Sequence, residues 1–405
     1  MSAHPAPALA PSRSETSRPP ALAGLRVALA HDWLTGRRGG ERVLERLCAL
    51  FPGAPIYTLV HRPGSTSTAI ESHPIVTSPL QRLPGADRSW RRLLPLMPLA
   101  VEALRPEGVD LVLSSSHCAV KALRAPKGAR HLSYVHTPMR YVWDQAEAYF
   151  GPGRASSPVR ALAALGAPAL RRWDAWSTRR ADRLVANSAC VRDRIRRAWG
   201  RESVVVHPPV ELDRFVATPS PGDRGFYLVV AAFAPYKRID VALRAFRRLG
   251  RRLVVVGDGQ EAERLRPLFG PGVEWIRSAS DEEVAGLYRG CRAFVMPGEE
   301  DFGITPLEAQ ASGRPVIALG RGGATETVRP LGEPEPTGLF YPGAADPGPD
   351  DVDRLCEALL AFERAEDRFR PEACRAQAER FSPERFDREL CAEIVATLAE
   401  PSSSG

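Results

Sequence analysis

One stretch of the sequence, residues 296–328, constrains the fold more than any other part of the chain. A short apolar run leads into an acidic loop, and helix formers follow from Thr305. Thr305 is a good helix N-cap, Pro306 suits the first helical position, and Glu308 completes the spacing of a capping box. Gly313 ends this helix, residues 315–318 predict a buried strand, and a glycine pair opens a turn. The order strand, loop, helix, strand predicts a parallel βαβ unit.

The start of this predicted helix is suited to an anion. Free backbone N–H groups of residues 302–304 would point out of the helix, where the macrodipole adds positive charge. The carboxylates of Glu300 and Glu308 flank that point and would accept hydrogen bonds from sugar hydroxyls, although they repel phosphate. The combination suits a sugar nucleotide better than ATP. A purely structural interpretation fits the spacing equally well: Glu308 would only cap the helix, and residues 299–301 would form a solvated loop.

Length and composition describe an ordinary globular protein with two domains. The chain has 405 residues, of which 44% are hydrophobic and 25% charged. No run approaches the roughly 18 apolar residues of a membrane span. Residues 1–21 are rich in Ala, Pro and Ser, so we expect a disordered tail and no signal peptide there. The seven cysteines form no C-x-x-C pair, which indicates reduced thiols and a cytoplasmic protein.

The net charge of +7 arises from arginines spread along the chain. Nucleic acid and an anionic membrane surface are the candidate partners of such a surface. No nucleic-acid-binding motif is present, so nucleic acid is not expected. Residues 88–105 combine Trp, Arg and aliphatic side chains but contain Pro95 and Pro98. They fit either a membrane-interface segment or, more simply, a core helix with a basic outer face.

Strands alternate with helices along both halves of the chain, which predicts two parallel sheets covered on both faces. In the first half we expect strands at 25–30, 55–60, 109–114, 129–136 and 204–206, with a loop at 31–40. In the second half we expect strands at 226–231, 252–256, 273–276 and 315–318. Clustered prolines mark the boundary. The predicted parts are a domain at 22–207, a linker at 208–223, a domain at 224–380 and a helix at 381–400.

The segment E-D-F-G-I-T-P-L-E-A-Q-A-S-G-R-P-V-I-A, with Glu300 and Glu308 spaced as E-x7-E, resembles the donor-site signature of retaining glycosyltransferases of family four. The resemblance extends over roughly residues 25–395 and is most specific in the second half. It implies the GT-B fold, in which two Rossmann-like, doubly wound parallel-sheet domains face each other across a cleft. It also implies that the helix at 381–400 crosses back to the first domain.

The resemblance assigns residues in the first domain as well. Gly39 and Gly40 match a glycine pair that lies near the donor phosphates in this family. His136, at the end of a predicted strand, matches a histidine that lines the donor sugar pocket. The segment H-T-P-M-R-Y resembles a bacterial subgroup that assembles surface polysaccharides, several of whose members use GDP-mannose. Candidate acceptor contacts follow in the sequence: Arg140, Tyr141, Trp143 and Asp144.

Lys237 lies between the first strand and helix of the second half, where its ammonium could neutralise a diphosphate. Family members place an arginine five residues before this lysine, but here that position is Ala232. Lys237 would therefore act alone or with Arg238, although a surface position for Arg238 is equally consistent with the sequence.

The predicted chemistry needs no metal. We find no convincing D-x-D, since Asp351 and Asp353 stand at a late helix start, where they would act as caps. Fixed donors can stabilise the leaving diphosphate instead, and the family is likewise metal-independent. We predict that His136, Glu300 and Lys237 form the catalytic set. The predicted donor-binding set is Gly39, Gly40, Arg238, Phe302, Gly303, Ile304, Thr305 and Glu308.

These observations and the resemblance together predict a glycosyltransferase that moves a hexose from a nucleotide sugar to a lipid-linked or oligosaccharide acceptor in cell-surface glycan synthesis. The resemblance alone implies that the enzyme is retaining, and it favours mannose as the sugar. It would act in the cytoplasm, as a peripheral protein at the inner membrane face. Two alternatives stay open. One is a sugar-nucleotide epimerase of the same fold, and the other is a non-catalytic nucleotide-sugar-binding protein, which the alanine at position 232 favours. The sequence does not identify the base, the sugar or the acceptor.

Overall fold

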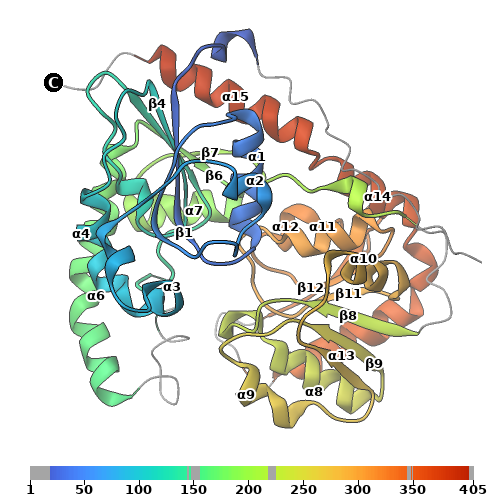
Figure 1. The fold of residues 1–405 in the computed structure, drawn as a ribbon. Coiled ribbons are helices and arrows are strands. Elements are labelled where there is room, and N and C mark those ends of the chain that lie inside the picture. The colour runs from blue at the N-terminus through green and yellow to red at the C-terminus, as the bar shows by residue number, and fades with distance from the viewer. Residues whose placement is uncertain are drawn as a thin grey trace, which may run out of the picture.

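The computed structural model of the chain describes residues 19–143, 146, 156–217, 225–343, 348 and 350–400. They form two α/β domains, one blue to green and the other olive to orange in Figure 1. Residues 1–18 of the predicted tail and part of the predicted linker lie outside the described residues. Pro20–Leu22 form the short helix η1, and Leu22 is fully buried in the core of the first domain.

The first domain contains a parallel seven-stranded sheet in the order β3-β2-β1-β4-β5-β6-β7. Its strands are β1 Val27–Leu34, β2 Ile56–His61, β3 Ile75–Thr77, β4 Leu111–Ser116, β5 Arg130–Val135, β6 Arg183–Ala186 and β7 Val204–Val205. Its helices are α1 Gly39–Leu50, α2 Thr68–Glu71, α3 Ala86–Ser89, α4 Met97–Glu102, α6 Ser157–Ser177 and α7 Ala189–Trp199. Turns of 3-10 helix include η3 Trp90–Leu96 and η4 Val120–Ala122.

The second domain contains a parallel six-stranded sheet in the order β10-β9-β8-β11-β12-β13. Its strands are β8 Phe226–Val230, β9 Arg252–Val256, β10 Val273–Ile276, β11 Phe294–Met296, β12 Val316–Leu319 and β13 Gly338–Tyr341. Its helices are α8 Ile239–Leu249, α9 Ala262–Leu265, α10 Asp281–Gly290, α11 Ile304–Ala311, α12 Ala324–Thr327 and α13 Asp350–Arg364. The short α9, α12 and β13 carry too little periodicity to be predicted from the sequence.

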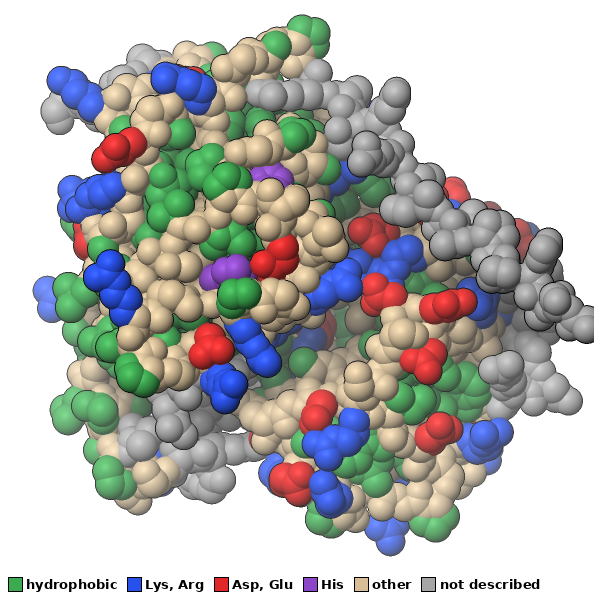
Figure 2. Space-filling model, in the orientation of Figure 1, with side chains coloured by type: hydrophobic (Ala, Val, Ile, Leu, Met, Phe, Trp, Pro, Cys, Tyr) green, Lys and Arg blue, Asp and Glu red, His purple; other side chains and the backbone are tan. Residues whose placement is uncertain are grey.

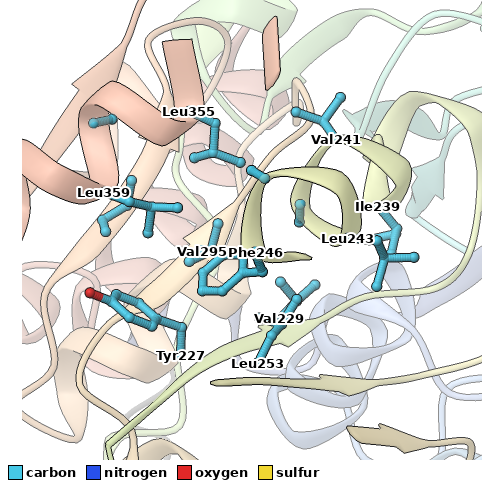
Figure 3. Close-up of a cluster of buried hydrophobic side chains, with 14 of the residues drawn as sticks. Tyr227, Val229, Ile239, Val241, Leu243, Phe246, Leu253, Val295, Leu355 and Leu359 are labelled. Atoms are coloured by element: carbon cyan, nitrogen blue, oxygen red, sulfur yellow. The ribbon is translucent and has the colours of Figure 1, made fainter. Parts of the chain in front are cut away.

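The core of the second domain shows why the apolar stripes of its helices face the sheet. Figure 3 shows Leu243 and Phe246 of α8 pointing toward Val229 of the sheet, while Leu359 approaches from α13. Phe246 is completely buried, and its ring lies 5.1 Å from that of Tyr227. Burying a side chain of this size contributes about 1.5–3 kcal/mol to the stability of the fold, so this layer of side chains stabilises the second domain.

The C-terminal helices connect the two domains. Helix α14, Pro371–Glu379, packs against α11 in the second domain, and α15, Pro383–Ala399, continues across to the first domain (Figure 1). Phe386 and Ile394 of α15 are fully buried in the first domain's core. Ion pairs join the same helix to α1 and β6, through Arg46 with Asp387 and Arg183 with Glu393.

Two predicted elements differ from the structure. Strand β1 runs on to Leu34, so the predicted loop at 31–40 begins four residues later. The strand extends because Trp33 pairs in register with Val60 of β2, because His31 Nδ1 lies 3.2 Å from Ser115 Oγ of β4, and because buried Asp32 accepts hydrogen bonds from the segment after β4. The predicted helix around 88–105 is broken into η3 and α4 with Pro95 inside η3, and it leaves Leu99 exposed.

Among the described residues, we find no helix whose length and apolar character would let it cross a bilayer.

Both sheets share one topological property. In each sheet the strand order reverses next to the first strand, between β1 and β4 in the first domain and between β8 and β11 in the second. Ligands of open α/β sheets bind at the carboxyl ends of the strands on either side of such a switch point. The two switch points therefore predict where a site should lie in each domain.

Candidate functional site

A cleft of about 1130 Å³ lies between the domains, at the carboxyl ends of both sheets. Figure 2 shows acidic and basic side chains close together along the hollow between the domains. Residues from both switch points line it, including His117 after β4 and Lys237 after β8. The structure brings nearly all the predicted site residues to this cleft: Gly39, Gly40, His136, Lys237, Glu300, Phe302, Gly303, Ile304, Thr305 and Glu308.

Arg238 is the exception. It is not among the residues that line the cleft, and its Nη1 donates to Asp351 Oδ2 of α13 at 2.6 Å. Its backbone has a φ of 52°, in the left-handed region. Asp351 is fully buried, and although burial favours the protonated acid, Arg238 and a backbone N–H hold the pKa of its carboxyl below the usual value. The prediction that Arg238 binds the donor is therefore not supported, because its charge is used to fix the start of α13.

Lys237 and Glu300 face each other across the floor of the cleft. Lys237 Nζ donates to Glu300 Oε1, and both side chains are largely buried. Burial is the main cause that lowers the pKa of Lys237 to about 7, and the neighbouring Arg140 adds to it while Asp301 opposes it. The carboxylate of Glu300 also favours the charged ammonium. A ligand that carries both phosphate and hydroxyl groups can separate this buried ion pair. Its phosphate would then contact the ammonium, and its hydroxyl groups would donate to the carboxylate.

Glycines fix the loop that carries Glu300. Gly323 N–H donates to Glu300 O at 2.8 Å, and a Cβ on Gly323 would lie 2.2 Å from Phe302 Cα. A Cβ on Gly298 would lie 2.1 Å from Tyr236 O, so the Lys237 loop and the Glu300 loop pack backbone against backbone. No side chain fits at these contacts, which explains why the sequence has glycine there.

Helix α11 does not start as the sequence predicted. It begins at Ile304 with Gly303 as its N-cap, at a φ of 90°, and no side chain caps it. The predicted capping box is therefore wrong, since Thr305 is already helical and Glu308 Oε2 accepts a hydrogen bond from the Tyr288 hydroxyl at 3.0 Å. The left-handed glycine begins the helix earlier than the threonine would. The consequence for the site is that Glu308 faces the cleft and is not held by the helix start.

Glu308 is enclosed near α1 of the first domain. Burial raises the pKa of its carboxyl, while Arg42 of α1 and the Tyr288 hydroxyl oppose that effect.

The glycine pair at the start of α1 brings the two domains close together. A Cβ on Gly39 would lie 3.4 Å from Ile304 Cδ1, and one on Gly40 would lie 3.5 Å from His136 Nε2. The two glycines therefore let a backbone segment approach the start of α11 and His136.

His136 contributes a neutral imidazole to the cleft. Its Nε2 lies 2.8 Å from Ser115 Oγ, and its backbone N–H bonds to Ser116 O. Burial lowers its pKa to about 3, with His31 adding to the effect and Asp32 and Asp301 opposing it. The ring is thus uncharged at neutral pH, and it can bind a hydroxyl group without repelling the nearby cations.

The acidic run at 299–301 is not a solvated loop. Arg194 of α7 donates to Glu299 at 2.7 Å and also pairs with Asp301, while Arg140 Nε donates to Asp301 Oδ2 at 3.0 Å. We call Arg140, Arg194, Glu299 and Asp301 the interdomain clasp. It joins the first domain to both neighbours of Glu300. The solvated-loop interpretation is therefore wrong, and sequence reasoning missed Arg194 because nothing local marks its partner.

The predicted acceptor contacts separate into distinct groups. Arg140 and Tyr141 line the cleft, and the guanidinium of Arg140 lies 4.3 Å from the Tyr236 ring, beside Lys237. Trp143 instead donates its indole N–H to buried Asp174 at 2.7 Å. Asp144 lies outside the described residues.

Another contact with the second domain lies next to the clasp. Glu326 of α12 accepts hydrogen bonds from the backbone N–H groups of Ala189 and Cys190 at the start of α7, at 2.8 and 3.0 Å. His207 Nε2 lies 2.9 Å from the same carboxylate. Although burial favours the protonated acid, these partners hold the pKa of Glu326 below its usual value. The start of α7 is therefore fixed to the second domain by charge.

Comparison with known proteins gives two family matches. Residues 37–214 match the model described as Glycosyltransferase Family 4, and residues 212–373 match the model described as Glycosyl transferases group 1. A D-inositol 3-phosphate glycosyltransferase of Geodermatophilus obscurus is 34% identical over 185 residues, which are 37% of this chain and 40% of that protein. A GDP-mannose-dependent phosphatidylinositol monomannoside mannosyltransferase of Mycolicibacterium smegmatis is 31% identical over 178 residues, 36% of this chain and 47% of that protein. The chain thus spans less than half the length of these curated relatives.

Solved structures agree in fold. A sucrose-phosphate synthase of Thermosynechococcus elongatus superposes with a TM-score of 0.69 at 20% identity, covering 92% of this chain and 98% of that chain. The Anabaena protein HepE, whose structure contains UDP and glucose, superposes with a TM-score of 0.67 at 17% identity, covering 92% and 100%. The two family matches meet end to end over residues 37–373, and the switch points of both domains face the same cleft. Each half of the chain therefore matches a glycosyltransferase family model, and the chain has the GT-B fold.

Proposed function

We propose that this protein is a retaining, metal-independent glycosyltransferase that moves a hexose from a nucleotide sugar to a lipid-linked or oligosaccharide acceptor in cell-surface glycan synthesis. Mannose is the favoured sugar and GDP-mannose the favoured donor. The observation that carries the proposal is the contact between Lys237 and Glu300, which lies beside the start of α11 and opposite His136. The similarity to a GDP-mannose-dependent enzyme supports the choice of sugar.

Each group has a role that its chemistry allows. Lys237 and the backbone N–H groups at residues 302–305 stabilise the negative charge that builds up on the leaving diphosphate. Pro306, which lacks an N–H, removes one donor from the first turn of α11. Glu300 and neutral His136 hold hydroxyl groups of the donor sugar, and Glu308 holds those of the ribose. Gly39 and Gly40 leave room for the diphosphate between α1 and α11.

The reaction breaks the bond between the anomeric carbon and the phosphate oxygen and forms one from that carbon to the acceptor oxygen. The acceptor proton moves to the oxygen of the leaving diphosphate, so the atoms balance without a separate base. The transition state has oxocarbenium character, which a nearby carboxylate stabilises. Retention of configuration requires attack from the face that the diphosphate leaves, and the proposal takes it from the family resemblance.

The proposed location is the cytoplasm, as a peripheral protein at the inner membrane face. Leu96 and Leu99 are 44% and 73% exposed, and they lie in a basic segment of the first domain. Apolar side chains with arginines around them suit an anionic membrane surface. A lipid-linked acceptor would be reached from that position, and no nucleic acid is expected as a partner.

A donor screen tests the proposal. GDP-mannose, UDP-glucose, UDP-N-acetylglucosamine and UDP-galactose are each incubated with the purified protein in EDTA, and release of the nucleoside diphosphate is measured. We expect turnover of one donor, GDP-mannose first, unaffected by EDTA and lost in Glu300→Gln. Glu202→Gln, which changes an exposed carboxylate paired with Arg196, is the matched control and should keep full activity.

The other outcomes identify the alternatives. Donor binding without turnover would overturn the proposal in favour of a non-catalytic binding protein. Conversion of the donor sugar without release of the diphosphate would identify an epimerase. Full activity of Glu300→Gln would overturn the assignment of the site, and loss of activity in EDTA would overturn metal independence.

A further inference from the structure

The last residue of β4 and the segment that follows it, together residues 116–121, are built around the carboxylate of Asp32. Asp32 is fully buried and accepts hydrogen bonds from four consecutive backbone N–H groups, those of residues 117–120, at 2.6–2.9 Å. The Ser116 hydroxyl donates to the same carboxylate at 3.2 Å. Burial favours the protonated acid, but His117 and the backbone donors hold the pKa of Asp32 below its usual value. The segment therefore folds around a fixed negative charge.

The other end of this segment is fixed as firmly. Lys121 is 2% exposed, and its Nζ donates to fully buried Asp174 at 2.6 Å. The same ammonium lies 5.4 Å from the Trp173 ring and 5.3 Å from the Trp199 ring. Because both ends are held by buried charges, the segment is rigid. His117 is the side chain of this segment that lines the cleft.

His117 is arranged as a hydrogen-bond acceptor toward the cleft. Its Nδ1 lies 3.5 Å from Asp32 Oδ2, and its side chain is 25% exposed. Burial lowers its pKa to about 4, with His136, Arg38 and Arg140 contributing and Asp32 opposing. The ring is therefore neutral at pH 7, and the negative charge of Asp32, 3.5 Å from Nδ1, favours the tautomer with hydrogen on Nδ1. Nε2 is then left with a lone pair, which is suited to accept a hydrogen bond from a hydroxyl group.

Aromatic side chains adjoin this acceptor. The His117 ring lies 4.3 Å from that of Trp33, edge to face, and Trp33 stacks on Trp90 at 3.8 Å. Both tryptophans line the same cleft, and the His136 ring lies 6.2 Å from that of His117. Because Trp33 and Trp90 are only 3% and 5% exposed, this wall offers a small apolar surface, together with one neutral acceptor beside the histidine assigned to the donor sugar. A sugar ring, with a C–H face and outward hydroxyls, matches that combination of apolar surface and acceptor better than a flexible chain does.

We propose that His117 binds the attacking hydroxyl of the acceptor through Nε2, in a subsite walled by Trp33 and Trp90, and that the acceptor presents a saccharide or another cyclic polyol there. The inference rests on the proposed function and adds the acceptor contact to it. Asp32 acts through His117 as a positioning residue, since it fixes both the segment and the ring. The proton still leaves with the diphosphate, so His117 orients the hydroxyl and is not a required base.

The test separates acceptor binding from donor binding. With a donor identified by the screen, transfer is measured to octyl α-D-mannopyranoside, octyl β-D-glucopyranoside and, as a non-cyclic polyol, 1-O-octylglycerol. We expect transfer to at least one glycoside, at ten times or more the rate with octylglycerol. His117→Ala should raise the acceptor KM about tenfold or more, while the donor Kd from calorimetry stays within twofold. His117→Gln, whose amide oxygen can accept a hydrogen bond, should recover part of the loss.

His61→Ala is the control, because its ring pairs with Glu71 and does not line the cleft. Three results would overturn the inference: an acceptor KM unchanged in both His117 variants, a preference for octylglycerol, or no transfer to any of the three acceptors by an enzyme that still hydrolyses its donor. If His117→Ala does not fold, His117→Gln decides. Failure of the proposed function is recognised separately, because the unmodified protein would then release no nucleoside diphosphate at all.

Discussion

The two walls of the cleft are built from the same strand order but use charge in opposite ways. In the first domain, the buried carboxylate of Asp32 is surrounded by backbone donors, and the neighbouring rings of His117 and His136 are neutral. In the second domain, Lys237 and Glu300 pair with each other at the surface of the cleft. At its switch point the first wall therefore presents neutral polar and aromatic groups, although charged side chains such as Arg38 and Arg42 line the cleft at the neighbouring start of α1. The other wall presents an ion pair that a ligand can separate.

This difference shows what topology does and does not decide. The switch point determines where side chains meet, because it is a property of the strand order. The distribution of charge between the walls depends on single residues at the strand ends, such as Ala232 where the family has an arginine. The second domain is suited to a diphosphate through its ammonium and helix start, and the first is suited to hydroxyl groups. Four predictions test this division.

The largest effect is expected for Lys237→Ala. Removing one fixed donor for developing negative charge lowers kcat by about 10²–10³ fold, and Lys237 is the cation that we assign to the leaving diphosphate. Initial rates with saturating donor measure the loss. Lys127→Ala, which removes an exposed lysine on the first domain, should keep its rate. A fall of less than threefold in Lys237→Ala would mean that the division between the walls is wrong.

The next largest effect concerns how tightly the walls are packed. A Cβ on Gly323 would overlap the backbone of Phe302, whereas one on Gly39 would make an ordinary contact with Ile304. Overpacking of this kind costs about 1–3 kcal/mol, so Gly323→Ala should lower the midpoint of urea unfolding clearly more than Gly39→Ala. Gly166→Ala, with open space around its Cβ, is the control and should be neutral or slightly stabilising. Equal midpoints in Gly323→Ala and Gly39→Ala would contradict the idea that the Glu300 loop is held by backbone contact.

The sequence predicted the parts of this architecture that depend on local pattern. Residues 252–256 and 273–276 form the strands that the pattern predicted, with the same bounds. The cleft residues around Glu300 were found through the resemblance of a long segment. The predicted capping box is wrong because the same segment can begin its helix either after a Thr305 cap or at an earlier residue. The left-handed backbone of Gly303 begins the helix at Ile304, so Thr305 is already helical.

The remaining errors concern contacts between distant residues. Arg238 next to Lys237 has the same local sequence signal as a phosphate ligand, but its partner Asp351 lies 113 residues away. The roles of Asp32 and Arg194 likewise depend on partners at the ends of other strands and in the other domain. The polar run S-S-S-H at 114–117, of which the three serines are buried at the end of β4, was a signal in the sequence that pointed to this site. Buried polar groups need partners, so such a run at a strand end indicates a site.

The third prediction concerns the interdomain clasp. Arg194→Ala removes one partner of both Glu299 and Asp301, so the Glu300 loop loses part of its hold on the first domain, although Arg140 still pairs with Asp301. Since small displacements of positioned groups reduce rates strongly, we expect kcat to fall about tenfold with a smaller change in donor Kd. Arg196→Ala on the same helix removes an exposed pair with Glu202 and should have no effect. Small-angle scattering should show a more open molecule for Arg194→Ala but not for Arg196→Ala. The clasp would be refuted if Arg194→Ala lowered the rate without changing the scattering and Arg196→Ala lowered the rate equally.

The smallest effect is a pH dependence of donor affinity. Burial lowers the pKa of Lys237 to about 7, and a bound diphosphate would raise it, so the donor binds best to the protonated amine. Affinity is then full below pH 7 and falls as the pH rises through 7 toward the raised pKa, by at most about tenfold per unit. Burial also raises the pKa of Glu41 in the cleft to about 7, so calorimetry between pH 6 and 9 needs a variant that isolates the lysine. Lys237→Arg keeps its charge over this range and should flatten the profile. An equally steep profile in that variant would assign the titration to Glu41, on the first domain's wall, and would remove Lys237 as the group that distinguishes the two walls.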